Sequence, residues 1–284
     1  MFRMNDDAAI ADALGAALLA SHAVSGGCIH HSRCLDLADG RRVFVKSADG
    51  SGARMLVAEE MGLRLLSPHI RTPVIVGSGE AKGSRWLALE WLDLAPMRPA
   101  AWEDLGRQMA RLHEARSTCH GLDHDNFIGA TPQENRPLAC WSAFFLERRL
   151  QPQLALARRL RIALPEDDIL AAASRLLDGH DPTPSLLHGD LWSGNTAAIT
   201  GDRAVVFDPA PYFGDAETDL AMLELFGGPL PEAFRKGYGI LPSGRESRRP
   251  LYDLYHALNH LNLFGTGYAG MVARCVEEIG RPFR

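Results

Sequence analysis

A loop between two short apolar runs constrains this chain of 284 residues more than any other stretch. The first run ends at Leu187 and the second is Ala204–Phe207, and we expect both to be short buried strands. Asp190 and Asn195 stand in the loop between them, and Asp208 follows the second run directly. Two strands joined by a loop would hold these three side chains at one edge of a small sheet, so we expect them to lie together.

The three residue types suit the transfer of a phosphoryl group. The carboxylate of Asp190 can accept the proton of an attacking hydroxyl, while the Asn195 amide oxygen and the Asp208 carboxylate are the hard ligands that Mg²⁺ prefers beside phosphate oxygens. This order is typical of kinase catalytic loops. Any one of the three could equally shape a turn. Together they predict Asp190 as the base and Asn195 and Asp208 as metal ligands.

Composition excludes several classes of protein. With 46% hydrophobic and 23% charged residues the chain is an ordinary globular protein, and its net charge of -5 argues against a nucleic-acid partner. Five cysteines without a CxxC pair suggest neither a disulfide framework nor a zinc site, and they predict a reducing compartment. The sequence shows no signal-peptide pattern and no apolar run of about 18 residues. We therefore expect a cytoplasmic protein without a membrane partner; its oligomeric state stays open.

The first 92 residues predict a small sheet packed against one main helix. Asp39-Gly40 is a tight turn signal between two runs of strand character, which predicts a hairpin. We expect helices at 8–21 and 53–67 and strands at 28–37, 41–46, 72–76 and 85–92.

A stretch with prolines and small residues at 93–101 resembles a linker, and the pattern beyond it is mainly helical. We expect helices at 102–114, 141–161, 165–178, 218–226, 231–238, 248–264 and 268–279. The fold class predicted is therefore α+β with two lobes. Residues 1–92 would form a nucleotide-binding lobe with a small antiparallel sheet, and residues 93–284 a larger α-rich lobe for catalysis and acceptor binding.

If the second lobe supplies the base and the metal ligands, the first must hold the nucleotide. Lys46 ends the second hairpin strand, where its ammonium can reach phosphate groups. Glu59 on the following helix can hold that ammonium in place, with Glu60 as the alternative. A single lysine could also be a solvated strand end, but the position of Lys46 relative to the downstream residues favours the phosphate role.

Two further nucleotide contacts are predicted from chain order. Gly26 and Gly27 open the hairpin and could cover the phosphates, although they match neither GxGxxG nor GxxxxGK[ST] and could equally cap a helix. The segment from Glu90 to Leu92 lies between the last strand and the linker, where its backbone could meet an adenine ring.

The acceptor must lie against Asp190, so its contacts are expected within the loop and just after Asp208. The candidates are Trp192, which could stack on a sugar or pack beneath it, and Tyr212, Asp215 and Glu217. Asp215 and Glu217 could equally lie at the surface. For Asp219 we favour a helix cap or a bond to the backbone of the loop.

Other reactive side chains give weaker signals. His256 and His260 stand four apart on a predicted helix, but two ligands do not make a metal site, so we expect structural roles for them. Cys28 beside Gly27 could be an oxidation-sensitive thiol.

Over nearly its whole length the chain resembles the fructosamine kinase family, which is related to aminoglycoside phosphotransferases and other small-molecule kinases. The parts that fit best are His188-Gly189-Asp190-Leu191-Trp192-Ser193-Gly194-Asn195 and the run from Phe207 to Met222, and the stretch from His260 to Tyr268 fits too. His188-Gly189-Asp190 alone would indicate only the wider phosphotransferase group, whereas Leu191–Asn195 and the stretch from Ile128-Gly129 to Asn135 are specific to the family.

The resemblance implies a protein-kinase-like fold and phosphorylation, with ATP and Mg²⁺, of the sugar 3-hydroxyl of a ketoamine such as a fructosamine or ribulosamine. The phosphorylated product would then decompose by elimination and release the amine, and this is a deglycation or repair activity. The arginine-rich stretch at 238–250 and His30-His31 depart from the family pattern and leave the acceptor open. An aminoglycoside, a choline-like alcohol or another amino sugar is the alternative acceptor, and a catalytically silent binding protein is the other alternative.

Overall fold

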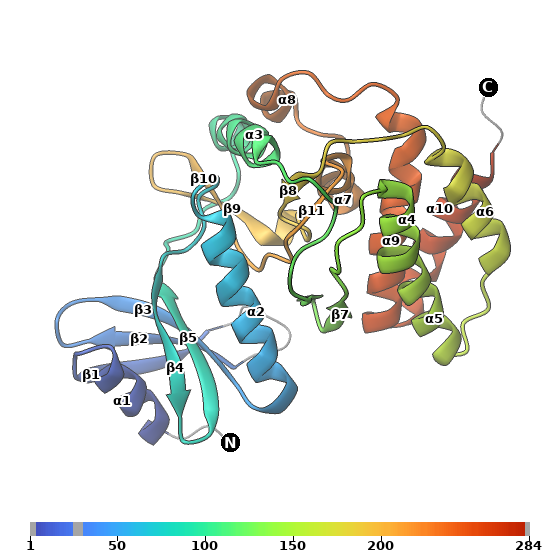
Figure 1. Ribbon diagram of the computed structural model, residues 1–284. Coiled ribbons are helices and arrows are strands. Elements are labelled where there is room, and N and C mark those ends of the chain that lie inside the picture. The colour runs from blue at the N-terminus through green and yellow to red at the C-terminus, as the bar shows by residue number, and fades with distance from the viewer. Residues whose placement is uncertain (1–3, 25–30, 282–284) are drawn as a thin grey trace.

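The structure is a computed structural model that describes residues 4–24 and 31–281. Its N-terminal part is a five-stranded antiparallel sheet in the order β1-β2-β3-β5-β4 with two helices (Figure 1). These elements are α1 Met4–Ala13, β1 Leu18–Ala23, β2 His31–Leu37, β3 Arg42–Ala48, α2 Gly50–Leu66, β4 Ile75–Ala81 and β5 Ser84–Glu90. The predicted hairpin is confirmed, and Gly40 takes the positive φ of 85° that its tight turn requires.

Alternation along β3 decides which side chains face the rest of the protein. Val43 and Val45 pack in a cluster with Ile10 of α1, on one face of the sheet. Phe44 belongs to the cluster on the other face, where α2 packs, and Lys46 shares that face because side chains two apart on a strand point the same way. The alternation of side chains along β3 therefore directs the Lys46 side chain toward α2.

The predicted helix at 8–21 is only half correct. Helix α1 ends at Ala13, Gly15 has a φ of 79°, and the chain then forms strand β1, which pairs with β2. The sequence of β1, Leu-Leu-Ala-Ser-His-Ala, shows little hydrophobic periodicity of its own. Pairing with a strand distant in sequence overrides their local preference.

The remainder of the chain is rich in helices, most of them within a few residues of the predicted bounds. Helix α9 lies in its core and is buried along most of its length. The elements are α3 Pro99–Glu114, β6 Asn126–Ile128, β7 Thr131–Gln133, α4 Trp141–Phe145, η1 Leu146–Leu150, α5 Gln151–Arg159, α6 Glu166–Leu176, β8 Ser185–Leu187, η2 Ser193–Asn195, β9 Thr196–Ile199, β10 Arg203–Val206, β11 Tyr212–Gly214, α7 Glu217–Gly227, α8 Glu232–Tyr238, α9 Arg245–Phe264, η3 Thr266–Tyr268 and α10 Ala269–Gly280.

Three short antiparallel ladders hold the loops of this part: β6 with β7, β8 with β11, and β9 with β10. The apolar runs on either side of the predicted catalytic loop (residues 188–195) are β8 and β10, as predicted, whereas the β6–β7 hairpin, β9 and β11 were not predicted. A small antiparallel sheet beside a helix-rich remainder confirms the α+β class.

The sheet ends at Glu90 and α3 begins at Pro99. The predicted domain boundary between residues 92 and 93 lies in the segment between them, and it stays a prediction. Among the described residues, the helices lack the combination of length and apolar character needed to cross a membrane.

Candidate active site

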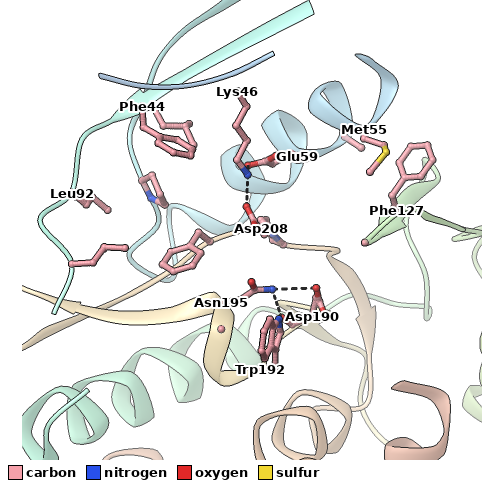
Figure 2. Close-up of a pocket in the computed structure, with 18 of the residues that line it drawn as sticks. Phe44, Lys46, Met55, Glu59, Leu92, Phe127, Asp190, Trp192, Asn195 and Asp208 are labelled. Atoms are coloured by element: carbon pink, nitrogen blue, oxygen red, sulfur yellow. Dashed lines mark hydrogen bonds and ion pairs between the residues drawn. The ribbon is translucent and has the colours of Figure 1, made fainter. Parts of the chain in front are cut away.

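A pocket of about 1090 Å³ lies where the sheet, α2 and the helix-rich part meet (Figure 2). Its walls come from β3, α2, the segment after β5, the catalytic loop, the segment after β10, and helices α7 and α9. The predicted residues on its walls are Lys46, Glu59, Glu90, Leu92, Asp190, Trp192, Asn195 and Asp208. The structure therefore brings together in one cavity most of the site that was predicted.

Lys46 joins the two parts of the protein at this pocket. Its ammonium lies 2.7 Å from Glu59 Oε1 and also contacts Asp208, and Lys46 is only 5% exposed. Burial alone would lower the pKa of Lys46, but the two carboxylates raise it, so the group stays charged. Burial raises the pKa of Glu59, whereas the ammonium outweighs burial at Asp208 and lowers the pKa of that carboxyl. Asp208 is thus held as an anion.

Asp219 of α7 fixes the backbone of the catalytic loop. Its carboxylate accepts the N–H of His188 at 2.7 Å and of Gly189 at 2.9 Å, and it contacts His113 Nε2 at 3.2 Å. The expectation that Asp219 binds the loop backbone is therefore confirmed. Gly189 is required here, because its φ is 82° and a Cβ would lie 1.9 Å from the Ala210 carbonyl oxygen.

Asp190 follows this anchored turn and faces the pocket. Asn195 Nδ2 donates to the Asp190 backbone carbonyl at 2.9 Å and to its Oδ2 at 3.1 Å, which fixes the carboxylate (Figure 2). Burial, and after it the charge of Asp208, raises the pKa of Asp190 to about 7. A carboxylate with such a pKa can take a proton from a hydroxyl near neutral pH.

The donor groups beside Asp190 fit a magnesium ion. Because the Asn195 amide nitrogen donates to Asp190, the amide oxygen is directed away from that residue. Asp208 offers a carboxylate that is 39% exposed toward the pocket. An amide oxygen and a carboxylate are hard donors of the kind that hold Mg²⁺ together with phosphate oxygens.

Another part of the pocket wall is mainly apolar. It is lined by Val24, Phe44, Pro73, Leu89, Leu92 and Leu94. The side chain of Glu90 is already engaged, since it accepts the Val74 N–H at 2.6 Å and pairs with Arg71 at 2.5 Å. Any contact of Glu90 with a ring would therefore come from its backbone, as predicted. Gly26 and Gly27 lie outside the described residues.

Beyond Asp190 the pocket is walled by aromatic side chains. The ring of Trp192 meets Phe226 edge to face at 5.9 Å, and Phe226 lies 4.6 Å from the ring of His260. His260 also contacts Phe264 and Tyr268 at 5.5 and 5.2 Å. Phe226, His260, Phe264 and Tyr268 were not predicted from the sequence as pocket residues. One signal was available, because His260, Leu263 and Phe264 have the i, i+3, i+4 spacing of one helix face.

The other predicted acceptor contacts, Tyr212, Asp215 and Glu217, do not line the pocket. Tyr212 is fully buried beneath the guanidinium of Arg149, 3.9 Å from its ring centre. Asp215 accepts hydrogen bonds from Tyr252 at 2.6 Å and from the Glu217 N–H at 3.0 Å. The physical reason is that the chain turns away from the pocket after Asp208 and enters β11, which pairs with β8 in the core.

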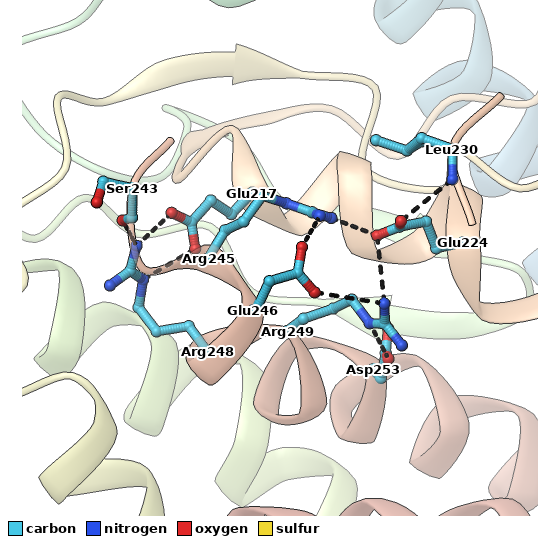
Figure 3. Close-up of polar contacts among 9 residues, drawn as sticks. All are labelled: Glu217, Glu224, Leu230, Ser243, Arg245, Glu246, Arg248, Arg249 and Asp253. Atoms are coloured by element: carbon cyan, nitrogen blue, oxygen red, sulfur yellow. Dashed lines mark hydrogen bonds and ion pairs between the residues drawn. The ribbon is translucent and has the colours of Figure 1, made fainter. Parts of the chain in front are cut away.

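Glu217 belongs instead to a network of ion pairs between α7 and α9 (Figure 3). Arg248 donates to its two oxygens at 2.9 and 2.5 Å. One guanidinium nitrogen of Arg245 pairs with Glu224 across the same two helices. The arginine-rich stretch therefore anchors α9 to the helix that carries Asp219.

Comparisons with known proteins identify the family of the chain. The fructosamine kinase family model matches residues 4–281. A probable ketoamine kinase of Synechocystis sp. is 45% identical over 263 residues, which are 90% of this chain and 88% of that protein. The crystal structure of a Thermobifida fusca protein described as a fructosamine-3-kinase has a TM-score of 0.87 and 32% identity, with 99% of this chain and 100% of that chain covered.

More distant structures share the fold alone. The crystal structure of an aminoglycoside phosphotransferase is 16% identical, with a TM-score of 0.60, and 96% of this chain and 95% of that chain are covered. The two-lobed kinase-like fold that was predicted is thereby confirmed. The chain belongs to the fructosamine kinase family.

Proposed function

We propose that this protein uses ATP to phosphorylate the sugar 3-hydroxyl of a ketoamine, a fructosamine or ribulosamine. The observation that carries the proposal is that Lys46, Asp190, Asn195 and Asp208 line one pocket, whose walls also include an apolar part and the aromatic wall. The kinship to proteins named ketoamine kinase and fructosamine-3-kinase supports this acceptor class.

Each group has a defined task in this proposal. Asp190 accepts the proton of the 3-hydroxyl as that oxygen attacks the terminal phosphorus of ATP, and ADP leaves on the opposite side. Lys46, held by Glu59, binds phosphate oxygens. Asn195 and Asp208 would hold Mg²⁺, which neutralises charge on the phosphates. Catalysis then consists mainly of positioning and charge stabilisation.

The aromatic wall supports a sugar acceptor. His260 Nδ1 lies 2.9 Å from the backbone carbonyl of His256, which can only accept, so the proton of the neutral ring is on Nδ1. Burial lowers the pKa of His260, which keeps the ring neutral. Its Nε2 is then a hydrogen-bond acceptor for a hydroxyl or amine of the ketoamine, and Trp192 offers a face on which a sugar can stack.

The product of this reaction explains a repair role. A phosphate on C3 is attached to the carbon next to the C2 carbonyl. Loss of a proton from C1, on the other side of that carbonyl, gives an enaminol in which the C3–O bond is allylic, and phosphate is a good leaving group. Elimination breaks the C3–O bond, and hydrolysis of the product releases the amine. We place the reaction in the cytoplasm, where ATP is abundant and where the free thiols of the described cysteines are kept reduced.

The acceptor class is tested by the initial rate of ADP release. The purified protein is given ATP and Mg²⁺ with fructosyl-lysine, ribulosyl-lysine, an aminoglycoside or choline. We expect turnover of a ketoamine and background rates with the other two. Turnover of the aminoglycoside or choline alone would move the protein to another acceptor class.

The rate should depend on pH through Asp190. A base must be ionised to act, and the pKa of Asp190 is about 7. We therefore expect kcat/KM to fall as the pH is lowered through about 7 and to reach a plateau above it. Rates from pH 5.5 to 9 check this, and a profile that stays flat down to pH 5.5 would contradict it.

Replacing His260 by phenylalanine should affect the acceptor alone. The variant keeps an aromatic ring in the wall but loses the Nε2 acceptor, so we expect KM for the ketoamine to rise about tenfold, the cost of one hydrogen bond. KM for ATP, measured in the same preparation, is the internal control and should stay within about twofold. Equal changes in both KM values would argue against a direct contact with the acceptor.

A further inference from the structure

The backbone at the predicted metal ligand Asp208 is unusual and needs support. Asp208 has a φ of 56°, a left-handed conformation that is strained for a residue other than glycine. Pro209 and Pro211 follow it and carry no N–H, so the segment has few donors with which to fix itself. Its remaining amide, that of Ala210, donates to the His188 carbonyl at 2.9 Å.

The support comes from the β6–β7 hairpin. Gln133 Nε2 donates to the Ala210 carbonyl at 3.1 Å and to Asn126 Oδ1 at 2.7 Å. Asn126 Nδ2 in turn donates to the Pro211 carbonyl at 2.7 Å. Asn126 and Gln133 are directly opposite each other in the hairpin, and both are 3% exposed. Two buried amides therefore hold the carbonyls of Ala210 and Pro211, two and three residues after Asp208.

The hairpin is itself tied to the core of the helical part. Tyr255 of α9 donates its hydroxyl hydrogen to Gln133 Oε1 at 2.7 Å. With its oxygen engaged by Tyr255, the amide of Gln133 has a single orientation, in which the nitrogen faces Asn126 and Ala210. The chain of contacts thus runs from α9 through Gln133 to the segment after Asp208.

The same segment lies against other parts of the active site. The Ala210 carbonyl oxygen lies so close to Gly189 that a Cβ at Gly189 would be 1.9 Å from it. Gly189 directly precedes Asp190, the proposed base. The rings of Pro209 and Pro211 lie beneath Gly62 of α2, where a Cβ would be 3.1 to 3.3 Å from them. Helix α2 carries Glu59 one turn earlier. A shift of this segment would therefore reach the metal ligand, the base and the helix that holds Lys46.

We propose that Gln133 is a positioning residue for phosphoryl transfer: through the Ala210 carbonyl and Asn126 it holds the segment after Asp208 so that the Asp208 carboxylate faces the bound metal and nucleotide. Gln133 touches no reacting atom. The inference rests on the proposed role of Asp208 as a metal ligand. Partners that orient metal ligands in this way typically contribute about 10-fold to 100-fold to metal affinity.

The test uses Gln133→Met, which keeps the length of the side chain and removes its three hydrogen bonds. Binding of a non-hydrolysable ATP analogue is measured by calorimetry across a Mg²⁺ titration, a readout that needs no acceptor. We expect the Mg²⁺ concentration for half-maximal enhancement of binding to rise about tenfold. In turnover assays kcat should fall while KM for the ketoamine changes little.

Gln108→Met is the matched control. Gln108 is also buried, at 4% exposure, and makes three comparable bonds: it donates to the Ala204 carbonyl at 3.0 Å and to Asp104 at 2.6 Å, and it accepts the Arg71 N–H at 2.7 Å. Both variants should lose thermal stability to a similar extent. Only Gln133→Met should shift the Mg²⁺ midpoint, because Gln108 does not touch the segment after Asp208.

Two results would overturn the proposal. If Gln133→Met loses stability as Gln108→Met does but keeps the wild-type Mg²⁺ midpoint, the role of Gln133 is structural alone. If the wild type binds the analogue without any dependence on Mg²⁺, the metal role of Asp208 fails too. Should Gln133→Met not fold, Tyr255→Phe removes only the bond to Oε1 and should shift the midpoint about twofold to fivefold in the same direction. An unchanged midpoint in a folded Tyr255→Phe would also count against it.

Discussion

Asp190→Asn should reduce kcat by about 10²-fold to 10⁴-fold, the typical contribution of a general base, while the protein still binds ATP. An amide of the same shape keeps an oxygen that can accept from Asn195 Nδ2, so the loop should keep its geometry. The amide cannot take the proton of a hydroxyl. Initial rates of ADP release and calorimetric titration with ATP measure the two effects.

The same variant should be more stable than the wild type at pH 8. The folded protein holds the pKa of Asp190 at about 7, above the ordinary value of 3.8, so ionising this carboxyl opposes folding. The opposition sets in as the pH rises from about 4 and is complete above about 7. Because Asp190 faces the pocket, we expect a gain of about 1–2 kcal/mol at pH 8 and almost none at pH 4. A gain of the same size at both pH values would exclude this cause.

Lys46→Met should have the second large effect, on stability as well as on rate. Without the ammonium, Glu59 at 8% exposure and the side chain of Asp208 face each other with no cation between them. Removing one partner of a buried ion pair typically costs about 3–5 kcal/mol, and we expect about 3 because the side chain of Asp208 is 39% exposed. Chemical denaturation at pH 8 measures the loss.

The pH dependence separates this cause from lost packing. In the variant both carboxyls should have pKa values above those of the unfolded chain, so the destabilisation fades as the pH falls and a proton is taken up. We expect the loss at pH 5 to be clearly smaller than at pH 8. Lys46→Arg keeps the charge and is the control: it should remain close to the wild type in stability but lose rate, because a guanidinium places its charge differently from an ammonium.

Chain order was enough to predict that the residues proposed for catalysis and phosphate binding line one pocket. Asp190, Asn195 and Asp208 stand beside two short apolar strands, so local sequence already places them at one edge. Lys46 lies on a strand and faces α2, and Glu59 is a buried position on that helix. Few other arrangements of these two side chains are possible, so they meet. Residues near in sequence to an apolar strand were therefore located well.

The acceptor half could not be predicted in the same way. Sequence proximity to Asp208 suggested Tyr212, Asp215 and Glu217, but the turn at the two prolines sends those side chains into the core. The aromatic wall comes mainly from α7, α9 and η3, whose meeting at the pocket depends on packing between helices far apart in the chain. Strand β1 was missed for a related reason, since only its partner strand makes it extended.

The central claim is tested most directly by ³¹P NMR of the reaction with fructosyl-lysine and ribulosyl-lysine in the presence of Mg²⁺ and ATP. The account predicts a phosphate monoester on C3 of at least one ketoamine, formed together with ADP, which then disappears as free lysine is released. Asp190→Asn should give no such signal. If no sugar phosphate forms with either ketoamine although the protein binds ATP, the proposed function is wrong.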